Sequence, residues 1–217
     1  MTNLTLIIGN KNYSSWSLRP WLLMRHFKLP FNEQRVLLFT ESTESDLAPY
    51  FSDSKVPVLV DGELTVWDSL AICEYISENH LDNKAWPEDS YARAIARSAS
   101  AEMHSSFAHL RNEMPMNCRR EISGITLSDK ALHEVDRVKQ IWRKCREEYG
   151  SDGRWLFGGF SIADAMFAPV VLRFQTYGVE LDGLEYKYAQ SLLAHPDVLC
   201  WLEAGRSETE IIAEDEL

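Results

Sequence analysis

The stretch KVPVLVDGELTVWDSLAICEYI, residues 55–76, contains two strands and a helix in succession. Val56–Val60 is a short apolar run typical of a buried strand, and an Asp-Gly hairpin signal joins it to the half-buried run Leu64–Trp67. Asp68 and Ser69 then begin a helix whose apolar side chains form a broad buried face. This order predicts an antiparallel strand pair followed by a helix.

The residues at the start of the chain predict a strand that leads into a helix. Leu4–Ile8 is short, branched and apolar, and a polar loop follows it. A helix is expected next, with Ser15 or Ser17 as its N-cap and with Pro20 in its first turn, where proline is tolerated.

Residues 31–51 supply the remaining elements of the first domain. Residues 31–38 mix apolar with polar residues in strand fashion, and residues 44–51 predict a short, weak helix. Residues 1–79 are therefore expected to form one α/β domain of βαβαββα order. After a linker at residues 80–88, no convincing strand occurs, so residues 89–217 are expected to form an all-helical domain.

Helical spacing dominates this second domain. Apolar residues recur at steps of three and four over residues 92–110 and 132–145, which predicts two long amphipathic helices. Ser161 begins a further helix, with Asp164 three residues later in a capping-box pattern, and two shorter helices follow. The last eleven residues hold five acids and no base, and they are expected to be solvated and mobile.

Composition limits the classes of function. The chain has 217 residues, 45% hydrophobic and 25% charged, and a net charge of −11, as expected for a soluble globular protein without a nucleic-acid or membrane partner. The four cysteines form no CxxC pair and are interpreted as reduced thiols of a cytoplasmic protein. No signal peptide, membrane span or metal-ligand motif is expected.

Three motifs occur in a characteristic order: SSWSLR at residues 14–19, KVPVL at 55–59 and DSLAI at 68–72. In this order and at these distances they resemble the cytosolic glutathione transferases, and SSWSLR is similar to the SSCxWR-type stretch of the zeta class. FSIADA at residues 160–165 adds a match in the helical domain. The resemblance covers nearly the whole chain and implies a thioredoxin-like N-terminal domain, an all-α C-terminal domain, glutathione as co-substrate and a homodimer.

The resemblance directs attention to the hydroxyls before the first helix. A thiol has a pKa of about 8.5, and a hydroxyl donor at a helix N-terminus favours its thiolate form. The zeta register points to Ser14, whereas counting back from Arg19 in the theta and delta pattern points to Ser15. We prefer Ser14, with Ser15 as the alternative catalytic residue and Tyr13 as a third candidate.

The same resemblance assigns residues to the rest of glutathione. Val56-Pro57 is expected to be a cis peptide, with the Val56 N–H and C=O offered to the cysteinyl part. Lys55 either reaches the glycyl carboxylate or is a solvated surface lysine. Asp68 and Ser69, at a helix N-terminus, are expected to hold the γ-glutamyl ammonium and carboxylate groups.

The second substrate is expected against the helical domain. Trp16, which stands where the zeta class has a cysteine, is interpreted as a wall for an apolar substrate. The candidates for attracting an acidic second substrate are Arg111, Arg119, Arg120, Arg173 and Tyr177. The alternative for each arginine is a solvated or ion-paired role.

These expectations favour a glutathione S-transferase of the detoxification type, in which a serine-stabilised thiolate attacks a small electrophile. One alternative is glutathione-dependent cis–trans isomerisation of an acidic dienone, as in the maleylacetoacetate isomerases of the zeta class. The other is a non-catalytic scaffold protein with the same fold.

Overall fold

The computed structural model describes residues 4–216. Its N-terminal part contains a four-stranded sheet of order β2-β1-β3-β4, in which β1 is parallel to β2 and antiparallel to β3, and β3 is antiparallel to β4. The strands are β1 Leu4–Ile8, β2 Asn32–Arg35, β3 Val58–Asp61 and β4 Leu64–Trp67. The antiparallel hairpin predicted from residues 55–76 is confirmed.

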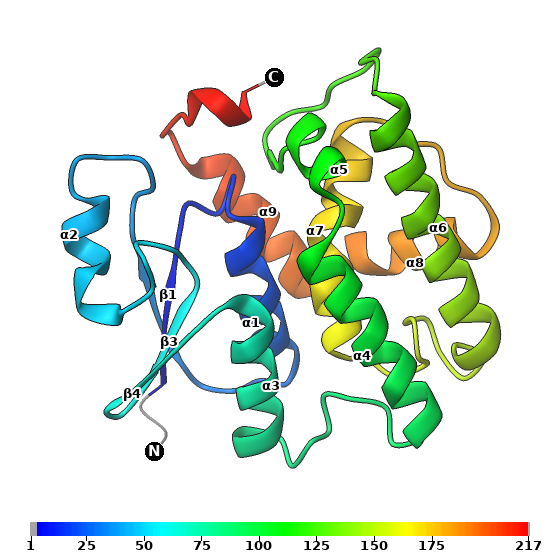
Figure 1. The fold of residues 1–217 in the computed structure, drawn as a ribbon, viewed down its shortest axis with the longest axis horizontal. Helices are drawn as coiled ribbons and strands as arrows, with labels where there is room; N and C mark the ends of the chain where they lie inside the picture. The colour runs from blue at the N-terminus through cyan, green and yellow to red at the C-terminus, as the bar shows by residue number, and fades with distance from the viewer. Residues whose placement is uncertain (1–3, 217) are drawn as a thin grey trace.

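Helices lie on both faces of this sheet (Figure 1). α1 Ser15–His26 and α3 Ser69–His80 cover the face toward the helical domain, and α2 Thr43–Leu47, continued by a 3-10 turn at Ala48–Tyr50, lies on the other. The side chains of β1 alternate accordingly. Leu4, Leu6 and Ile8 belong to the main core, whereas Ile7 packs with Leu47 and Val58 in a small separate cluster.

The start of α1 differs from the prediction. Ser14 is its N-cap, and the Ser14 Oγ accepts a hydrogen bond from the backbone N–H of Ser17 at 3.4 Å. Ser15 and Ser17, the two predicted caps, both lie inside the helix. Pro20 consequently lies beyond the first turn, where its missing N–H removes the hydrogen bond to the Trp16 carbonyl.

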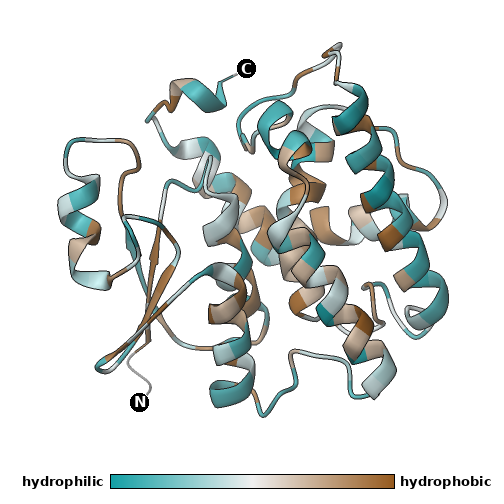
Figure 2. Cartoon of the chain, in the orientation of Figure 1, coloured by the Kyte–Doolittle hydropathy of each residue, from teal (hydrophilic) through white to brown (hydrophobic). Residues whose placement is uncertain are grey.

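Six helices follow and form the second half of the molecule (Figure 1). They are α4 Ser90–Ser105, α5 Ala108–Glu113, α6 Asp129–Tyr149, α7 Ile162–Thr176, α8 Gly183–Leu193 and α9 Pro196–Ser207. α7 is buried along nearly its whole length, whereas much of the surface of α6 is polar (Figure 2). Across residues 4–216 no helix has both the length and the apolar character needed to cross a bilayer.

One predicted helix is divided in two. The apolar spacing over residues 92–110 predicts a continuous helix, but α4 ends at Ser105 and α5 begins at Ala108. Phe107 between them has a left-handed backbone with φ of 63° and a buried side chain. The prediction of one long helix is therefore wrong. The apolar spacing did not reveal the bend, because the apolar side chains on both sides of it are still buried.

The acidic C-terminal segment contacts the N-terminal domain. It folds back to the loop before α1, where the Glu208 carboxylate accepts hydrogen bonds from the backbone N–H groups of Lys11 and Asn12 at 2.8 and 3.0 Å. A 3-10 turn at Ala213–Asp215 follows, and Ile212 is buried. The segment is therefore docked on the protein, although all of its described residues except Ile212 remain exposed or half-buried. The predicted mobility stays a prediction, and residue 217 lies outside the described residues.

Candidate active site

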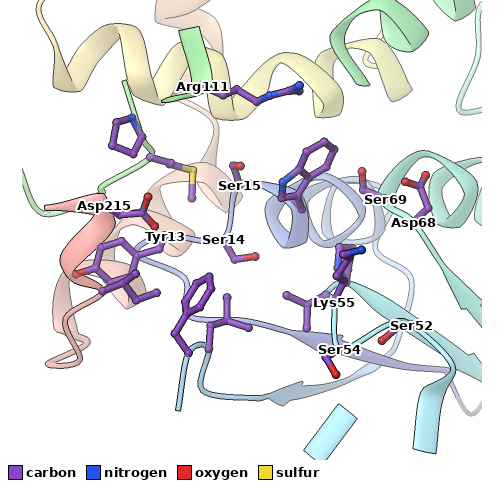
Figure 3. Close-up of a pocket in the computed structure, with 18 of the residues that line it drawn as sticks. Tyr13, Ser14, Ser15, Ser52, Ser54, Lys55, Asp68, Ser69, Arg111 and Asp215 are labelled. Carbon is purple, nitrogen blue, oxygen red and sulfur yellow. The ribbon is translucent and has the colours of Figure 1, made fainter. Parts of the chain in front are cut away.

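A cleft of about 880 Å³ lies between the sheet domain and the helical domain. Predicted site residues line it from both sides, and Figure 3 shows several of them around its opening. They are Ser14, Ser15, Trp16, Lys55, Val56, Pro57, Asp68, Ser69, Arg111 and Arg173. Tyr177 does not line the cleft: it is buried, and its hydroxyl donates a hydrogen bond to the Pro115 carbonyl at 3.0 Å.

Two serine hydroxyls lie at the N-terminus of α1, in the middle of the cleft (Figure 3). The Ser14 hydroxyl donates to the Ser17 Oγ at 2.8 Å, and that oxygen also accepts from the Gly9 N–H at 3.1 Å. The Ser15 Oγ accepts a hydrogen bond from the Nη2 of Arg173 at 3.3 Å. The two hydroxyls therefore have different partners although they are adjacent in sequence.

Tyr13, the third candidate, is engaged by the C-terminal segment. Its hydroxyl donates to the Glu216 carboxylate and accepts from the Nη2 of Arg119. Burial and the hydrogen bond with Glu216 raise the pKa of Tyr13. This proton is already used within the protein, which leaves the serines as the hydroxyl donors of the cleft.

The loop before β3 offers a backbone edge to the cleft. The Val56-Pro57 peptide is cis, as predicted. Neither the N–H nor the C=O of Val56 forms a hydrogen bond with another group in residues 4–216, so both are available to an extended peptide. The Lys55 ammonium pairs with the Asp53 carboxylate at 2.7 Å in an exposed position.

Asp68 caps α3 and also contacts the helical domain. Its Oδ1 accepts from the backbone N–H groups of Leu70 and Ala71 at 2.9 and 3.1 Å. Its Oδ2 lies 3.1 Å from the Nε2 of His104, on α4. Burial lowers the pKa of His104, which favours the neutral imidazole. This contact joins the two walls of the cleft.

Ser69 is supported from within the protein. Its Oγ accepts from the Nη1 of Arg19 at 3.2 Å, and no described group receives its hydroxyl proton. Because Ser69 is the first residue of α3, its backbone N–H also lacks an intrahelical partner. Both donors are suited to a carboxylate at the helix N-terminus.

Trp16 forms part of the wall between the two halves. The guanidinium groups of Arg19 and Arg111 lie 4.1 and 5.3 Å from the centre of its ring. The Trp16 and His104 rings are nearly perpendicular, with ring centres 5.5 Å apart. Trp16 therefore lines the cleft beside these cations, and its role as a wall for an apolar substrate stays a prediction.

Three arginines lie at this cleft: Arg111 and Arg173 line it, and Arg19 contacts the lining residues Trp16 and Ser69. Arg19, Arg111 and Arg173 form no ion pair with any carboxylate of the described residues, and their hydrogen-bond acceptors are serine hydroxyls and backbone carbonyls. Burial, together with the charge of Arg173, lowers the pKa of Arg19 to about 9. Burial, together with Arg111, lowers the pKa of Arg173 to about 10. Both remain charged at neutral pH.

The other two predicted arginines have a different environment. Arg119 and Arg120 both pair with the Glu216 carboxylate, at 3.2 and 3.0 Å. Neither lines the cleft. Their ion-paired alternative is confirmed, and they hold the C-terminal segment rather than a substrate.

Sequence reasoning did not identify several residues of the cleft. Ser52 is buried, and its hydroxyl has no partner among the described residues. Its position three residues before the KVPVL motif could have marked it as a candidate site residue. His104 lies on α4 and lines the cleft, and no local pattern marks it as a site residue. Ile212 and Asp215 come from the C-terminal segment, and no local pattern indicates that this segment returns to the cleft.

Comparison with known proteins agrees with this fold and cleft. Residues 13–79 match the family "Glutathione S-transferase, N-terminal domain", and residues 90–204 match "Glutathione S-transferase, C-terminal domain". The chain is 31% identical to the maleylacetoacetate isomerase of Dictyostelium discoideum over 211 residues, which cover 90% of this chain and 91% of that protein. It is 30% identical to glutathione S-transferase 1 of Dianthus caryophyllus over 142 residues, 63% of this chain and 62% of that one.

A solved structure has the same architecture. A glutathione transferase homolog from Burkholderia gl BGR1, determined with bound glutathione, superposes with a TM-score of 0.70 at 22% identity and covers 95% of this chain and 100% of that chain. The fold is that of a thioredoxin-like domain followed by an all-α domain. The chain belongs to the glutathione S-transferase family, enzymes whose co-substrate is glutathione.

Proposed function

We propose that the protein is a glutathione S-transferase that directs a serine-stabilised glutathione thiolate at a small electrophile. The observation that carries the proposal is the convergence on one cleft of the α1 hydroxyls, the free backbone edge of Val56 and the α3 N-terminus. The protein supplies position and electrostatics, and glutathione supplies the nucleophile.

Each part of glutathione has a complementary group in this proposal. The γ-glutamyl carboxylate binds the Ser69 hydroxyl and N–H, and its ammonium group faces Asp68. The cysteinyl backbone pairs with Val56 beside the cis Pro57 in the manner of an added strand. Lys55 is assigned to the glycyl carboxylate. The sulfur then lies toward Ser14 and Ser15.

The reaction follows from this arrangement. The thiol proton passes to solvent, the sulfur lone pair forms a bond to the electrophilic carbon, and the leaving group departs with the bonding pair or an addition product is protonated. A hydroxyl donor and nearby cations favour the thiolate, whose reference pKa of about 8.5 leaves little of it at neutral pH without help.

A second candidate is the cis–trans isomerisation of an acidic dienone. Arg111 and Arg173 face the cleft without carboxylate partners, and such cations suit a substrate that carries carboxylates. The relative from Dictyostelium discoideum is a maleylacetoacetate isomerase. In this reaction the thiolate adds to the dienone, rotation follows, and the same thiolate leaves, so glutathione is not consumed.

Calorimetric titration with glutathione tests the common part of both candidates. Wild type is expected to bind, Ser69→Ala to bind about tenfold more weakly through loss of a charge-assisted hydrogen bond, and Ser191→Ala, on the exposed side of α8, to match wild type. Absence of binding by wild type at millimolar glutathione would support the third alternative, a non-catalytic scaffold protein.

Measurements of turnover then distinguish the transferase from the isomerase. Loss of free glutathione thiol with an uncharged electrophile supports the transferase. Isomerisation of an acidic dienone at constant thiol concentration supports the isomerase, and Arg111→Gln is then expected to raise the KM of the dienone. These assays also test the proposed role in detoxification.

We further propose a cytoplasmic homodimer. The exposed Phe51 ring stands edge-on to Trp67 at 5.4 Å between ring centres, on the rim of the sheet domain, and paired exposed aromatic side chains suit an interface core. Sedimentation of wild type as a dimer and of Phe51→Ser as a monomer tests this assembly.

A further inference from the structure

Two serines in the cleft share an arrangement. Ser15 and Ser69 are each the first residue of a helix, and each Oγ accepts a hydrogen bond from a buried guanidinium group. Arg173 donates to Ser15 at 3.3 Å, and Arg19 donates to Ser69 at 3.2 Å. In each case the guanidinium group donates to a lone pair of the serine oxygen, so the proton of the hydroxyl is left for another acceptor.

The hydroxyl protons of the adjacent serines are used differently. A serine hydroxyl has one proton to donate and two lone pairs to accept. Ser14 gives its proton to the Ser17 Oγ at 2.8 Å as part of the α1 cap. Ser15 gives its proton to no described group and accepts only from Arg173. Of these two serines, only Ser15 can give its proton to a ligand without breaking a hydrogen bond of the described protein.

The Arg173 side chain is held in place for this contact. It reaches Ser15 from α7, it is almost fully buried, and its Nε donates to the Met114 carbonyl at 2.7 Å. The titratable groups that act on it are Arg111, Asp215, Tyr177 and Cys118. None of these forms an ion pair with it in the described part of the chain, so its charge is not neutralised by direct contact.

We propose that Arg173 is a positioning residue that orients and polarises the Ser15 hydroxyl toward the sulfur of bound glutathione, so that Ser15 is the catalytic serine. The inference rests on the proposed function and reverses the preference for Ser14 drawn from sequence. A donor that itself accepts from a cation is strengthened, because linked hydrogen bonds polarise one another. Ser15 keeps its proton and shares it with the sulfur, while the thiol proton goes to solvent.

The experiment is a double-mutant cycle read out by the ionisation of bound glutathione. The ultraviolet absorbance of the thiolate is followed against pH at saturating glutathione in wild type, Ser15→Ala, Arg173→Gln and the double variant. Each single change is expected to raise the pKa of the bound thiol by about 1, and the double variant is expected to equal the single variants. The surface control Arg137→Gln is expected to leave this pKa at the wild-type value, and Ser14→Ala is expected to shift it less than Ser15→Ala does.

Other results would overturn the proposal. An unchanged thiol pKa in Arg173→Gln, with only a raised KM for the electrophile, would make Arg173 a substrate anchor. Fully additive shifts would mean that it does not act through Ser15, and a shift in Ser14→Ala alone would return the role to Ser14. If Arg173→Gln does not fold, Arg173→Lys replaces it, because it keeps the buried charge and loses the guanidinium fork. Failure of wild type to bind glutathione would overturn the proposed function instead.

Discussion

Replacing Glu208 by alanine removes one attachment of the C-terminal segment, the one to the loop before α1. The Glu208 carboxylate, only 6% exposed, accepts from two backbone N–H groups, of Lys11 and Asn12, and pairs with Arg35 at 2.8 Å. These two residues belong to the loop that leads into α1. The substitution therefore acts on the segment and on the loop together.

The magnitude follows from the three contacts. Each backbone N–H loses a hydrogen bond to a charged acceptor, a loss of about 1.5 kcal/mol. The contact with the partly exposed Arg35 adds about 0.5 kcal/mol. Glu208→Ala is expected to lower the free energy of unfolding by about 3.5 kcal/mol. Glu210→Ala is the matched control: its carboxylate is more exposed and also pairs with Arg35, at 3.0 Å, so a loss of about 0.5 kcal/mol is expected.

Urea unfolding at neutral pH measures the free energies, and amide hydrogen exchange reports on the site itself. The amides of Lys11 and Asn12 are expected to exchange faster in Glu208→Ala and at the wild-type rate in Glu210→Ala. Equal stability of the two variants, or unchanged exchange at both amides, would show that the segment is not held through this carboxylate.

Three further predictions concern other parts of the chain. Burial and the charge of His195 lower the pKa of His26 to about 4, so the unfolded chain binds more protons between pH 4 and 6.5. The free energy of unfolding should therefore fall by about 1–2 kcal/mol as the pH is lowered through this window, after allowance for partial exposure of the ring. Unfolding experiments at several pH values should show a smaller fall for His26→Phe. Asp164→Ala is expected to cost about 3 kcal/mol in urea unfolding, because the buried N–H groups of Leu156 and Ser161 lose their acceptor; a loss below 1 kcal/mol would contradict this. His104→Leu should raise the KM of glutathione and His104→Gln should largely restore it, since only the amide can donate to Asp68; equal KM values for both variants would exclude a positioning role.

Local signals in the sequence predicted the elements and their order. The apolar runs, the Asp-Gly hairpin and the Ser161–Asp164 capping box each depend on neighbours within a few residues, and all of them are present in the structure. The cis peptide at Pro57 was inferred from motif resemblance and is confirmed. Local patterns and motif order were sufficient for the fold because neither depends on distant contacts.

The remaining features depend on residues far apart in sequence. The five acids of the C-terminal segment predict a solvated tail when the sequence is read locally, because the segment itself holds no base that could pair with them. Their partners Arg35 and Arg119 are distant in sequence, and these determine where the segment docks. The bend at Phe107 is hidden because apolar spacing continues through it. Which serine receives a hydrogen bond from Arg173 depends on how α7 packs on α1, and no pattern near residue 15 contains that information.

The uncompensated arginines of the cleft have a kinetic consequence in a chain of net charge −11. In dilute buffer of 0.01 M salt the Debye length is about 30 Å, so an approaching anion experiences the negative charge of the whole molecule and is slowed. At about 0.15 M the range falls to about 8 Å, so most of the surface acids are screened and the anion responds to the charges of the cleft itself. These include Arg111 and Arg173 beside the lining aspartates Asp53, Asp68 and Asp215. Moderate salt should thus speed the arrival of an anionic ligand, while the surface acids govern how fast it arrives and the cleft governs how long it stays.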